Sequence, residues 1–298
     1  MKEWVVKNED AKRLDKFLSE KEPSLSYGYL RRYLKENKIK VNGKKQPLSF
    51  QLCPGDTVRI FIPKKNAPTF LPVYEDQDLL VANKPAGLPV CGEDGTDTLI
   101  SRVLSYLGYD SSFSFKPCLC HRLDTGTSGL VLIAKTSAAE IFLTQLIRQR
   151  AIQKKYLCVT YGHPSPANAT LHAFLVKNAQ AGTVRIYQTP KANSKEIITA
   201  YRTLSISGRL ALLEVNLITG RTHQIRAHLA SIGCPILGDA KYGDQIINRE
   251  LRTKYQALCA YSLTFPEILS GPFAKWSCKK FELAPPWYAQ QILDKTLT

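Results

Sequence analysis

Residues 121–129 bring one acid, two bases and five small or hydroxyl side chains together in nine positions. The segment reads His-Arg-Leu-Asp-Thr-Gly-Thr-Ser-Gly, and its carboxylate is Asp124. The apolar residues 130–134 follow directly and predict a short buried strand. A polar loop beside a buried strand can hold a reactive group rigidly at a cleft. Asp124 is therefore a candidate catalytic carboxylate. The alternative is an Arg122–Asp124 pair that only braces the turn.

Two later segments carry side chains that suit the same kind of site. Tyr156 follows two lysines and opens a predicted strand over residues 156–161. Residues 222–233 predict a helix that ends at a glycine, and His223 and Arg226 share one stripe of it. By themselves these patterns also fit a half-buried tyrosine that anchors a strand and a basic helix face in water.

The three segments, in this order, resemble the shared motifs of RluA-type RNA pseudouridine synthases. His-Arg-Leu-Asp followed by Thr-Ser-Gly resembles the catalytic loop, and Gly-Arg-Thr-His-Gln-Ile-Arg, followed by Gly-x-Pro-Ile-Leu-Gly-Asp, resembles the last motif. The resemblance implies that Asp124 is the catalytic carboxylate and that Tyr156 stacks on the target base. It also implies that Arg226 pairs with Asp124.

The resemblance extends to residues around this set. It implies that Leu258 walls the base pocket, that Arg122 supports the loop or holds phosphate, and that His121 stabilises the flipped uridine. Two positions depart from the family pattern: Ala227 stands where valine is usual, and Cys259 stands where histidine is usual. The second departure leaves position 259 without an expected role.

Pseudouridine formation breaks the N1–C1′ bond of a uridine, turns the freed base and rejoins it through C5. One carboxylate can act as the nucleophile or stabilise an oxocarbenium-like sugar, and a neighbouring arginine favours its charged form. The reaction is an isomerisation, so we expect no cofactor and no metal. A glycoside hydrolase would need a second carboxylate. The runner-up function is a non-catalytic RNA-binding or ribosome-assembly factor, which would not need Asp124.

The chain has 298 residues, 44% of them hydrophobic, which is enough for a sizeable core and roughly two domains. A net charge of +16 predicts a polyanionic partner. We expect ribosomal RNA first and transfer RNA second, and neither DNA nor a membrane, because no basic amphipathic helix stands out.

No segment is typical of a signal peptide or a membrane span, and the eight cysteines are scattered without zinc spacing. We therefore expect a cytoplasmic protein, and a monomer.

Residues 1–62 predict a small basic module, with 14 Lys and Arg against 8 Asp and Glu, a net +6. Helix spacing after Asp10 and after Ser26 predicts two capped helices, and short strands follow around a turn at Asn42-Gly43. The pattern resembles the αL RNA-binding module of the small-subunit ribosomal protein S-four. We expect RNA contacts from Arg31, Arg32 and Lys44; the alternative is a solvated basic face.

Residues 63–70 predict a linker, and residues 71–298 predict the catalytic domain. Residues 137–140 match a capping box at the start of a helix, and strands are expected near residues 156–161, 183–188, 197–206 and 209–218. Many strands with few long helices between them predict an α+β fold. In this fold a small N-terminal module accompanies a larger domain, with a mixed or antiparallel sheet, flanking helices and a central cleft.

Overall fold

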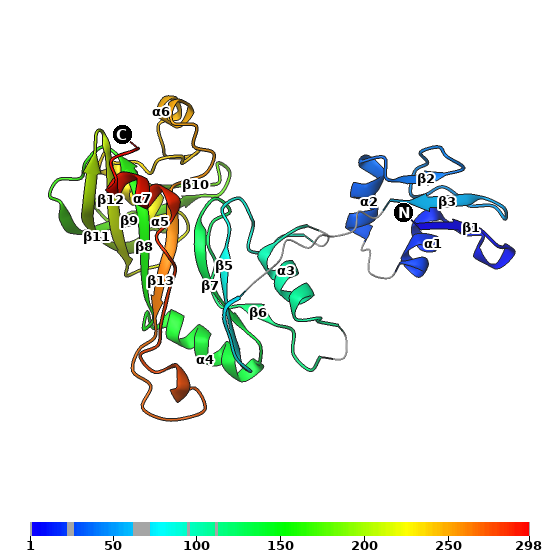
Figure 1. The fold of residues 1–298 in the computed structure, drawn as a ribbon, viewed down its shortest axis with the longest axis horizontal. Coiled ribbons are helices and arrows are strands. Elements are labelled where there is room, and N and C mark those ends of the chain that lie inside the picture. Colours follow the sequence, from blue (N-terminus) through cyan, green and yellow to red (C-terminus); the bar gives the residue numbers. More distant parts are fainter. Residues whose placement is uncertain (1, 23–26, 62–71, 94–95, 111–112, 298) are drawn as a thin grey trace. The chain divides into compact units, whose positions relative to one another are not determined.

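The structure, a computed structural model, describes residues 2–22, 27–61, 72–93, 96–110 and 113–297 (Figure 1). The chain forms two compact units. The first comprises Met1–Phe70 and Cys91–Tyr106, and the second comprises Leu71–Val90 and Leu107–Thr298. The linker expected at residues 63–70 lies outside the described residues.

The N-terminal part of the first unit is a three-stranded antiparallel sheet with two helices. The strands are β1 (Lys2–Val5), β2 (Ile39–Val41) and β3 (Thr57–Ile60), in the order β1-β3-β2. The helices are α1 (Leu14–Lys21) and α2 (Tyr27–Lys35). Their apolar positions, among them Leu14, Phe17 and Leu30, are fully buried against Ile39 and Val58. This small core fits the predicted module.

Two details of this module differ from expectation. Asp10 does not cap α1: Arg13 holds the N-cap position, while Asp10 ends a short 3-10 helix (η1, Asn8–Asp10) and pairs with Lys21 at 3.2 Å. The helix begins only at Leu14, after the extended residues Ala11 and Arg13, and helix spacing alone could not reveal this. The expected cap at Ser26 lies outside the described residues. Strand β1 was not expected at all, because four residues with one partly buried position carry little pattern.

The second unit is built on one large sheet. The order of the described strands is β10-β9-β11-β12-β8-β13-β7-β5-β4, with β6 paired to β7 and β14 to β13. Their bounds are β4 (Pro72–Glu75), β5 (Leu79–Lys84), β6 (Cys118–Leu119), β7 (Ser128–Ala134), β8 (Gln153–Tyr161), β9 (Asn168–Asn178), β10 (Thr183–Tyr187), β11 (Lys195–Ser207), β12 (Leu210–Leu217), β13 (Leu258–Thr264) and β14 (Lys280–Glu282). Among the described strands, only β7 and β13 run parallel, so the sheet is mixed and the predicted α+β fold is confirmed.

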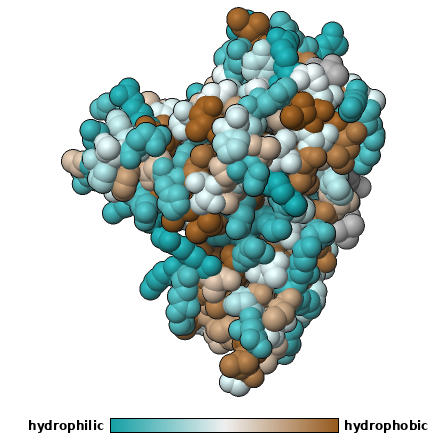
Figure 2. All heavy atoms as spheres, turned by 90° about the vertical axis from the view of Figure 1, so that its left-hand side faces the viewer, coloured by the Kyte–Doolittle hydropathy of each residue, from teal (hydrophilic) through white to brown (hydrophobic). Residues whose placement is uncertain are grey.

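The remaining helices of the chain are short. They are α3 (Leu99–Tyr106), α4 (Ser137–Arg148), α5 (Gln224–Ser231), α6 (Gln245–Glu250), η2 (Ala274–Trp276) and α7 (Trp287–Leu293). Helix α4 follows β7, and its Leu143 and Leu146 pack with Leu130 and Leu132 of that strand. On the face of the molecule in Figure 2, hydrophobic side chains are scattered among hydrophilic ones.

Two helix starts were predicted slightly wrongly. The cap of α4 is Thr136, whose Oγ1 accepts from the backbone N–H of Ala139 at 3.3 Å, so the cap lies one residue before the expected Ser137. Helix α5 is shorter than expected because His223, at its N-cap, adopts the left-handed conformation with φ 55°. A left-handed residue cannot continue a right-handed helix.

Tight contacts fix the loop at residues 121–129 against the centre of the sheet. Gly129, at the start of β7, has φ +116°, and a Cβ added there would lie 2.3 Å from the carbonyl oxygen of Ala260 on β13. A Cβ on Gly126 would lie 2.3 Å from the side-chain oxygen of Gln256. Small residues are therefore required where the loop meets β13. They bring Asp124 close to the middle of the sheet.

Candidate active site

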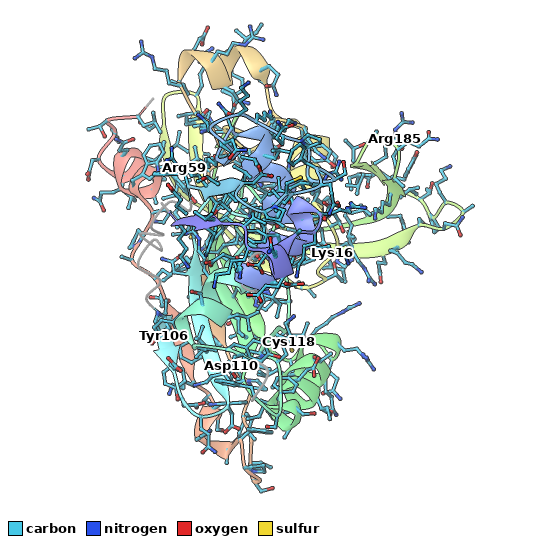
Figure 3. All side chains as sticks on the ribbon, turned by 90° about the vertical axis from the view of Figure 1, so that its right-hand side faces the viewer. Lys16, Arg59, Tyr106, Asp110, Cys118 and Arg185 are labelled. Atoms are coloured by element: carbon cyan, nitrogen blue, oxygen red, sulfur yellow. The ribbon has the colours of Figure 1, made fainter. Side chains whose placement is uncertain are left out.

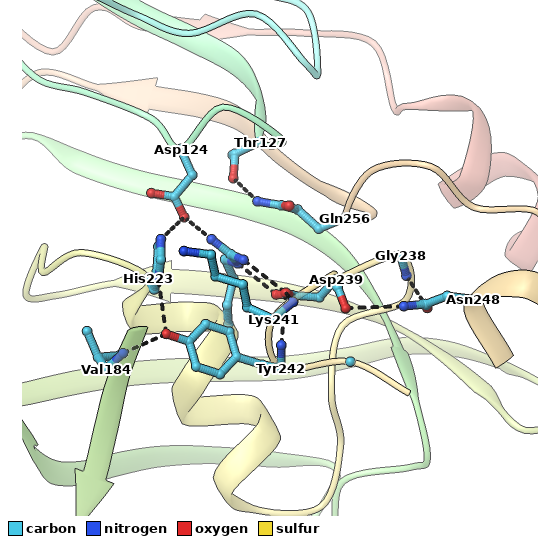
Figure 4. A network of polar contacts seen from close by, with 12 residues as sticks. Asp124, Thr127, Val184, His223, Gly238, Asp239, Lys241, Tyr242, Asn248 and Gln256 are labelled. Carbon is cyan, nitrogen blue, oxygen red and sulfur yellow. Dashed lines mark hydrogen bonds and ion pairs between the residues drawn. The ribbon is translucent and has the colours of Figure 1, made fainter. Parts of the chain in front are cut away.

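Asp124 lies in the loop between β6 and β7, and its carboxylate meets the side chain of Arg226 from α5 (Figure 4). Nη1 of Arg226 donates to Oδ2 of Asp124 at 2.8 Å. The Arg226 side chain is 6% exposed and that of Asp124 is 24% exposed. Oδ1 of Asp124 has no hydrogen-bond partner among the described residues. The carboxylate is thus held by one oxygen and free at the other.

The same guanidinium holds a second carboxylate. Nε and Nη2 of Arg226 donate to the two oxygens of Asp239 at 2.7 and 2.9 Å. Burial alone would lower the pKa of Arg226, but Asp239 and then Asp124 raise it above its ordinary value. Burial opposes ionisation of Asp239 as well, yet Arg226 and two backbone N–H groups hold the pKa of this carboxyl below its ordinary value. Arg226 and Asp239 are therefore both charged.

Asp239 was not predicted as a site residue, although it ends the quoted Gly-x-Pro-Ile-Leu-Gly-Asp run. Its side chain is fully buried. Its Oδ1 also accepts from the backbone N–H groups of Lys241 and Tyr242 at 2.8 and 3.1 Å. An aspartate directly after a buried apolar run, in a turn, was the signal that could have identified it.

His223 lies on the same side of Asp124 as Arg226. Its Nε2 is 4.0 Å from Oδ2 of Asp124, and its Nδ1 is 2.9 Å from the hydroxyl of Tyr242. The backbone N–H of Val184 donates to this hydroxyl at 2.8 Å, so the hydroxyl can donate its own proton to Nδ1. That arrangement leaves the ring proton on Nε2, facing the carboxylate. Burial lowers the pKa of His223 against the opposite effect of Asp124, so the ring is neutral near pH 7.

A cavity of about 310 Å³ opens at the Asp124 carboxylate. Tyr156 on β8 and Leu258 on β13 line it; they are 6% and 3% exposed. Burial, followed by the charge of Asp124, raises the pKa of the Tyr156 phenol, which therefore stays protonated. The cavity thus presents a carboxylate, an aromatic ring and an apolar wall to whatever enters it.

His121 and Arg122 also line this cavity. Nε2 of His121 accepts the backbone N–H of Leu132 at 3.1 Å, and burial lowers the pKa of the ring to about 3. His121 is therefore neutral, and one of its nitrogens is already occupied. Arg122 is exposed. Of the predicted set, Asp124, Tyr156, Arg226, His121, Arg122 and Leu258 come together here.

The three remaining predicted residues belong to the first unit. Arg31 lies on α2 and is exposed, and Lys44 is exposed in the turn after β2. The side chain of Arg32 lies outside the described residues.

Lys84 is a second supporting residue that was not predicted. It is fully buried, and its Nζ donates to the carbonyl oxygens of Pro85, Leu88 and Thr125 at 2.9, 2.8 and 3.0 Å. Burial lowers its pKa to about 8, against the raising effect of Asp124. The ammonium ties the turn after β5 to the residue that follows Asp124. A lysine inside an otherwise apolar strand was its signal.

The structure gives no sign of a metal centre or a membrane span in the part of the chain it describes. No three His, Cys, Asp or Glu side chains there are grouped to hold a metal ion, and no helix there is long and apolar enough to cross a membrane. All eight cysteines are free thiols. Burial raises the pKa of Cys118 and of Cys120 to about 12, so both thiols stay protonated.

Comparison with known proteins identifies the family of the chain. A family model described as RNA pseudouridylate synthase matches residues 78–231, and one described as S4 domain matches residues 12–58. A ribosomal large subunit pseudouridine synthase C from Rickettsia conorii is 35% identical over 292 residues, which cover 90% of this chain and 93% of the relative. The uncharacterized RNA pseudouridine synthase YlyB of Bacillus subtilis is 31% identical over 277 residues, 89% of each chain.

Among solved structures, human RNA pseudouridylate synthase domain containing 4 is 27% identical, with a TM-score of 0.60 over 75% of this chain and 92% of the human chain. The family expected from the three motifs is therefore confirmed. Because family model and relatives together span nearly the whole sequence, the chain belongs to the RluA-type RNA pseudouridine synthases, which are isomerases, and it carries an N-terminal S4 RNA-binding domain.

Proposed function

We propose that this protein converts uridines of large-subunit ribosomal RNA to pseudouridine, with Asp124 as the catalytic carboxylate. The observation that carries the proposal is the carboxylate itself: Oδ2 is held by Arg226 at 2.8 Å, while Oδ1 is free at a cavity walled by Tyr156 and Leu258. The substrate class rests on the relatives named ribosomal large subunit pseudouridine synthase C, at up to 35% identity. The enzyme acts as a cytoplasmic monomer.

Each side chain has one part in the proposed reaction. The target uridine is flipped out of its RNA helix, because a paired base cannot reach the cavity. Its base stacks on the ring of Tyr156 and meets Leu258. The carboxylate of Asp124, held by Arg226, attacks the uridine or stabilises the sugar while the N1–C1′ bond breaks. The base turns, C5 bonds to C1′, C5 loses its proton and N1 ends protonated, so no atom is gained or lost.

Around this centre, Arg122 and His121 support the loop and the flipped nucleotide. We place the catalytic domain at residues 71–298, after a linker at 63–70. Residues 1–62 supply RNA affinity through Arg31, Arg32 and Lys44, in support of which the S4 family model matches residues 12–58.

The substrate is tested by incubating the purified protein with transcripts of large-subunit ribosomal RNA, small-subunit ribosomal RNA and transfer RNA. Pseudouridine is then mapped in each. We expect new pseudouridines at one or a few positions of the large-subunit transcript. Product confined to transfer RNA would contradict the proposed substrate but not the reaction, and no product in any RNA would contradict both.

A further inference from the structure

Lys154 lies at the start of β8, two residues before Tyr156. Alternate residues of a strand point to the same face, and both side chains line the cavity at Asp124. The ammonium lies beside the segment that leads into α5, because a Cβ added to Gly220 would be 3.7 Å from Nζ. No described residue forms a hydrogen bond or an ion pair with this ammonium. It is a cation at the active site without a counterion.

The side chains that line the cavity carry more positive than negative charge. Its described lining includes four cations, Arg122, Lys154, Arg221 and Arg226, and one carboxylate, Asp124. Arg226 is already matched by Asp124 and the buried Asp239. Burial lowers the pKa of Lys154, and no carboxylate offsets this effect. A half-buried cation that keeps its charge needs an anion, and that anion comes with the substrate.

We infer that Lys154 binds the phosphodiester next to the flipped uridine. This inference rests on the proposed function. A phosphate fits better than a carbonyl of the base, because a charged partner neutralises the ammonium whereas a neutral carbonyl does not. The neighbouring first turn of α5 carries the partial positive charge of a helix N-terminus, which favours an anion at the same place. Arg221, exposed beside Gly220, adds to this field.

The next residue provides a matched control. Lys155 points to the opposite face of β8, where its Nζ donates to Glu214 at 2.7 Å. Glu214 also accepts from Arg202 at 2.7 Å and from the hydroxyl of Tyr261 at 3.1 Å, so it keeps partners when Lys155 is replaced. Lys154→Gln and Lys155→Gln therefore remove the same charge from adjacent positions, but only the first removes it from the cavity.

The test pairs these variants with altered RNA. A synthetic RNA stem-loop carries a uridine of a large-subunit ribosomal RNA segment that the wild-type protein binds, and a neutral methylphosphonate replaces the linkage on the 5′ side or on the 3′ side of this uridine. Affinity is measured by titration. At one of the two linkages, the methylphosphonate should lower the affinity of wild type, Lys155→Gln and Lys154→Arg by roughly tenfold or more relative to normal RNA. A loss of this size corresponds to one hydrogen bond to a charged group. Lys154→Gln should bind the normal RNA more weakly and lose clearly less affinity than wild type with that methylphosphonate.

Equal losses for Lys154→Gln and wild type at both linkages would overturn the assignment and indicate that Lys154 contacts the base or the sugar instead. Melting temperatures close to that of wild type would show that the variants are folded. Conversion of the normal stem-loop is recorded in parallel. If wild type converts the normal stem-loop but Lys154→Gln loses as much affinity as wild type with each methylphosphonate, only the inference about Lys154 is wrong. If Lys154→Gln loses less affinity than wild type but wild type forms no pseudouridine, only the proposed function is wrong.

Discussion

At the scale of single residues, the site depends on one guanidinium that binds two carboxylates in fixed directions. Arg226 uses Nη1 for Asp124 and both Nε and Nη2 for Asp239. Asp239 is fully buried and cannot move to follow a smaller cation. The planar fork of arginine therefore determines where the carboxylate of Asp124 lies.

Arg226→Lys should expose this dependence. A single ammonium keeps the charge but cannot contact both carboxylates in the same geometry. We expect the single-turnover rate at saturating RNA to fall by roughly tenfold or more, about 1.4 kcal/mol, while RNA affinity changes little. A lower affinity with an unchanged rate would instead make Arg226 an RNA-backbone contact.

Tyr156 should act through its ring. Base stacking on an aromatic side chain contributes roughly 1–3 kcal/mol, so Tyr156→Ala should weaken binding of the flipped substrate and slow the reaction. Tyr156→Phe keeps the ring and should stay close to wild type in affinity, measured by titration, and in single-turnover rate. If Tyr156→Phe is as inactive as Tyr156→Ala, the hydroxyl has a chemical role that stacking does not explain.

The chemistry-bearing residues could be predicted from the sequence because each lies in a short motif of mixed side chains. Asp124 and Arg226 are 102 positions apart, and only the family resemblance related them before the structure placed them 2.8 Å apart. Asp239 and Lys84 escaped prediction because their roles are made by partners distant in sequence or by backbone carbonyls. Local patterns do not encode such partners.

At the scale of elements, Asp76 ties the turn before β5 to the loop after β13. Its Oδ2 accepts from Nε1 of Trp276 at 2.8 Å and from the hydroxyl of Tyr74 at 2.9 Å. Its Oδ1 accepts the backbone N–H groups of Asp78 and Leu79, both at 2.8 Å. Burial alone would raise the pKa of Asp76, but these hydrogen bonds lower it from 3.8 to about 2. The ionised form is thus favoured in the folded state.

This lowered pKa predicts a pH dependence of stability. Above pH 3.8 the ionised Asp76 contributes about 2 kcal/mol to the free energy of unfolding. The contribution is lost as the pH falls from about 4 to about 2, because the folded state must then bind the proton. Asp76→Asn should lower the urea midpoint clearly at pH 6 and much less near pH 2.5. A difference between the two proteins that does not shrink on acidification would contradict the assignment.

The elements themselves were predictable where hydrophobic periodicity is strong. The strands near 183–188, 197–206 and 209–218 and the helix after β7 were expected close to where they lie. Strand β9 was not expected, since Lys177 interrupts its alternation and several of its positions are only partly buried. Its hairpin with β10, which carries Arg185, projects from the sheet (Figure 3). Such a strand is specified by its pairing with β11 more than by its own pattern.

At the scale of the whole molecule, charge and chemistry are divided between different parts of the chain. Residues 1–62 carry a net +6 and none of the three site motifs. The triple variant Arg31→Gln, Arg32→Gln, Lys44→Gln should therefore bind RNA more weakly and with a shallower salt dependence. Each lost phosphate contact lowers the slope of log affinity against log salt by roughly 0.7–0.9. Titration across salt concentrations measures both quantities.

The single-turnover rate of this triple variant at saturating RNA should equal that of wild type, since the cavity is untouched. Equal affinity and equal slope would show that these three side chains are only a solvated basic face. A lower rate at saturation would show that the S4 domain takes part in the chemical step.

The central claim is that Asp124 performs the chemistry and does not merely brace its loop. Asp124→Asn keeps the size of the side chain and can still accept from Nη1 of Arg226, but it replaces the carboxylate at the cavity with a neutral amide. The decisive measurement follows pseudouridine formation and RNA affinity together, for wild type and Asp124→Asn, on the RNA that wild type converts. The account predicts no detectable pseudouridine with affinity nearly unchanged. Pseudouridine formation by Asp124→Asn at a rate near that of wild type would contradict it.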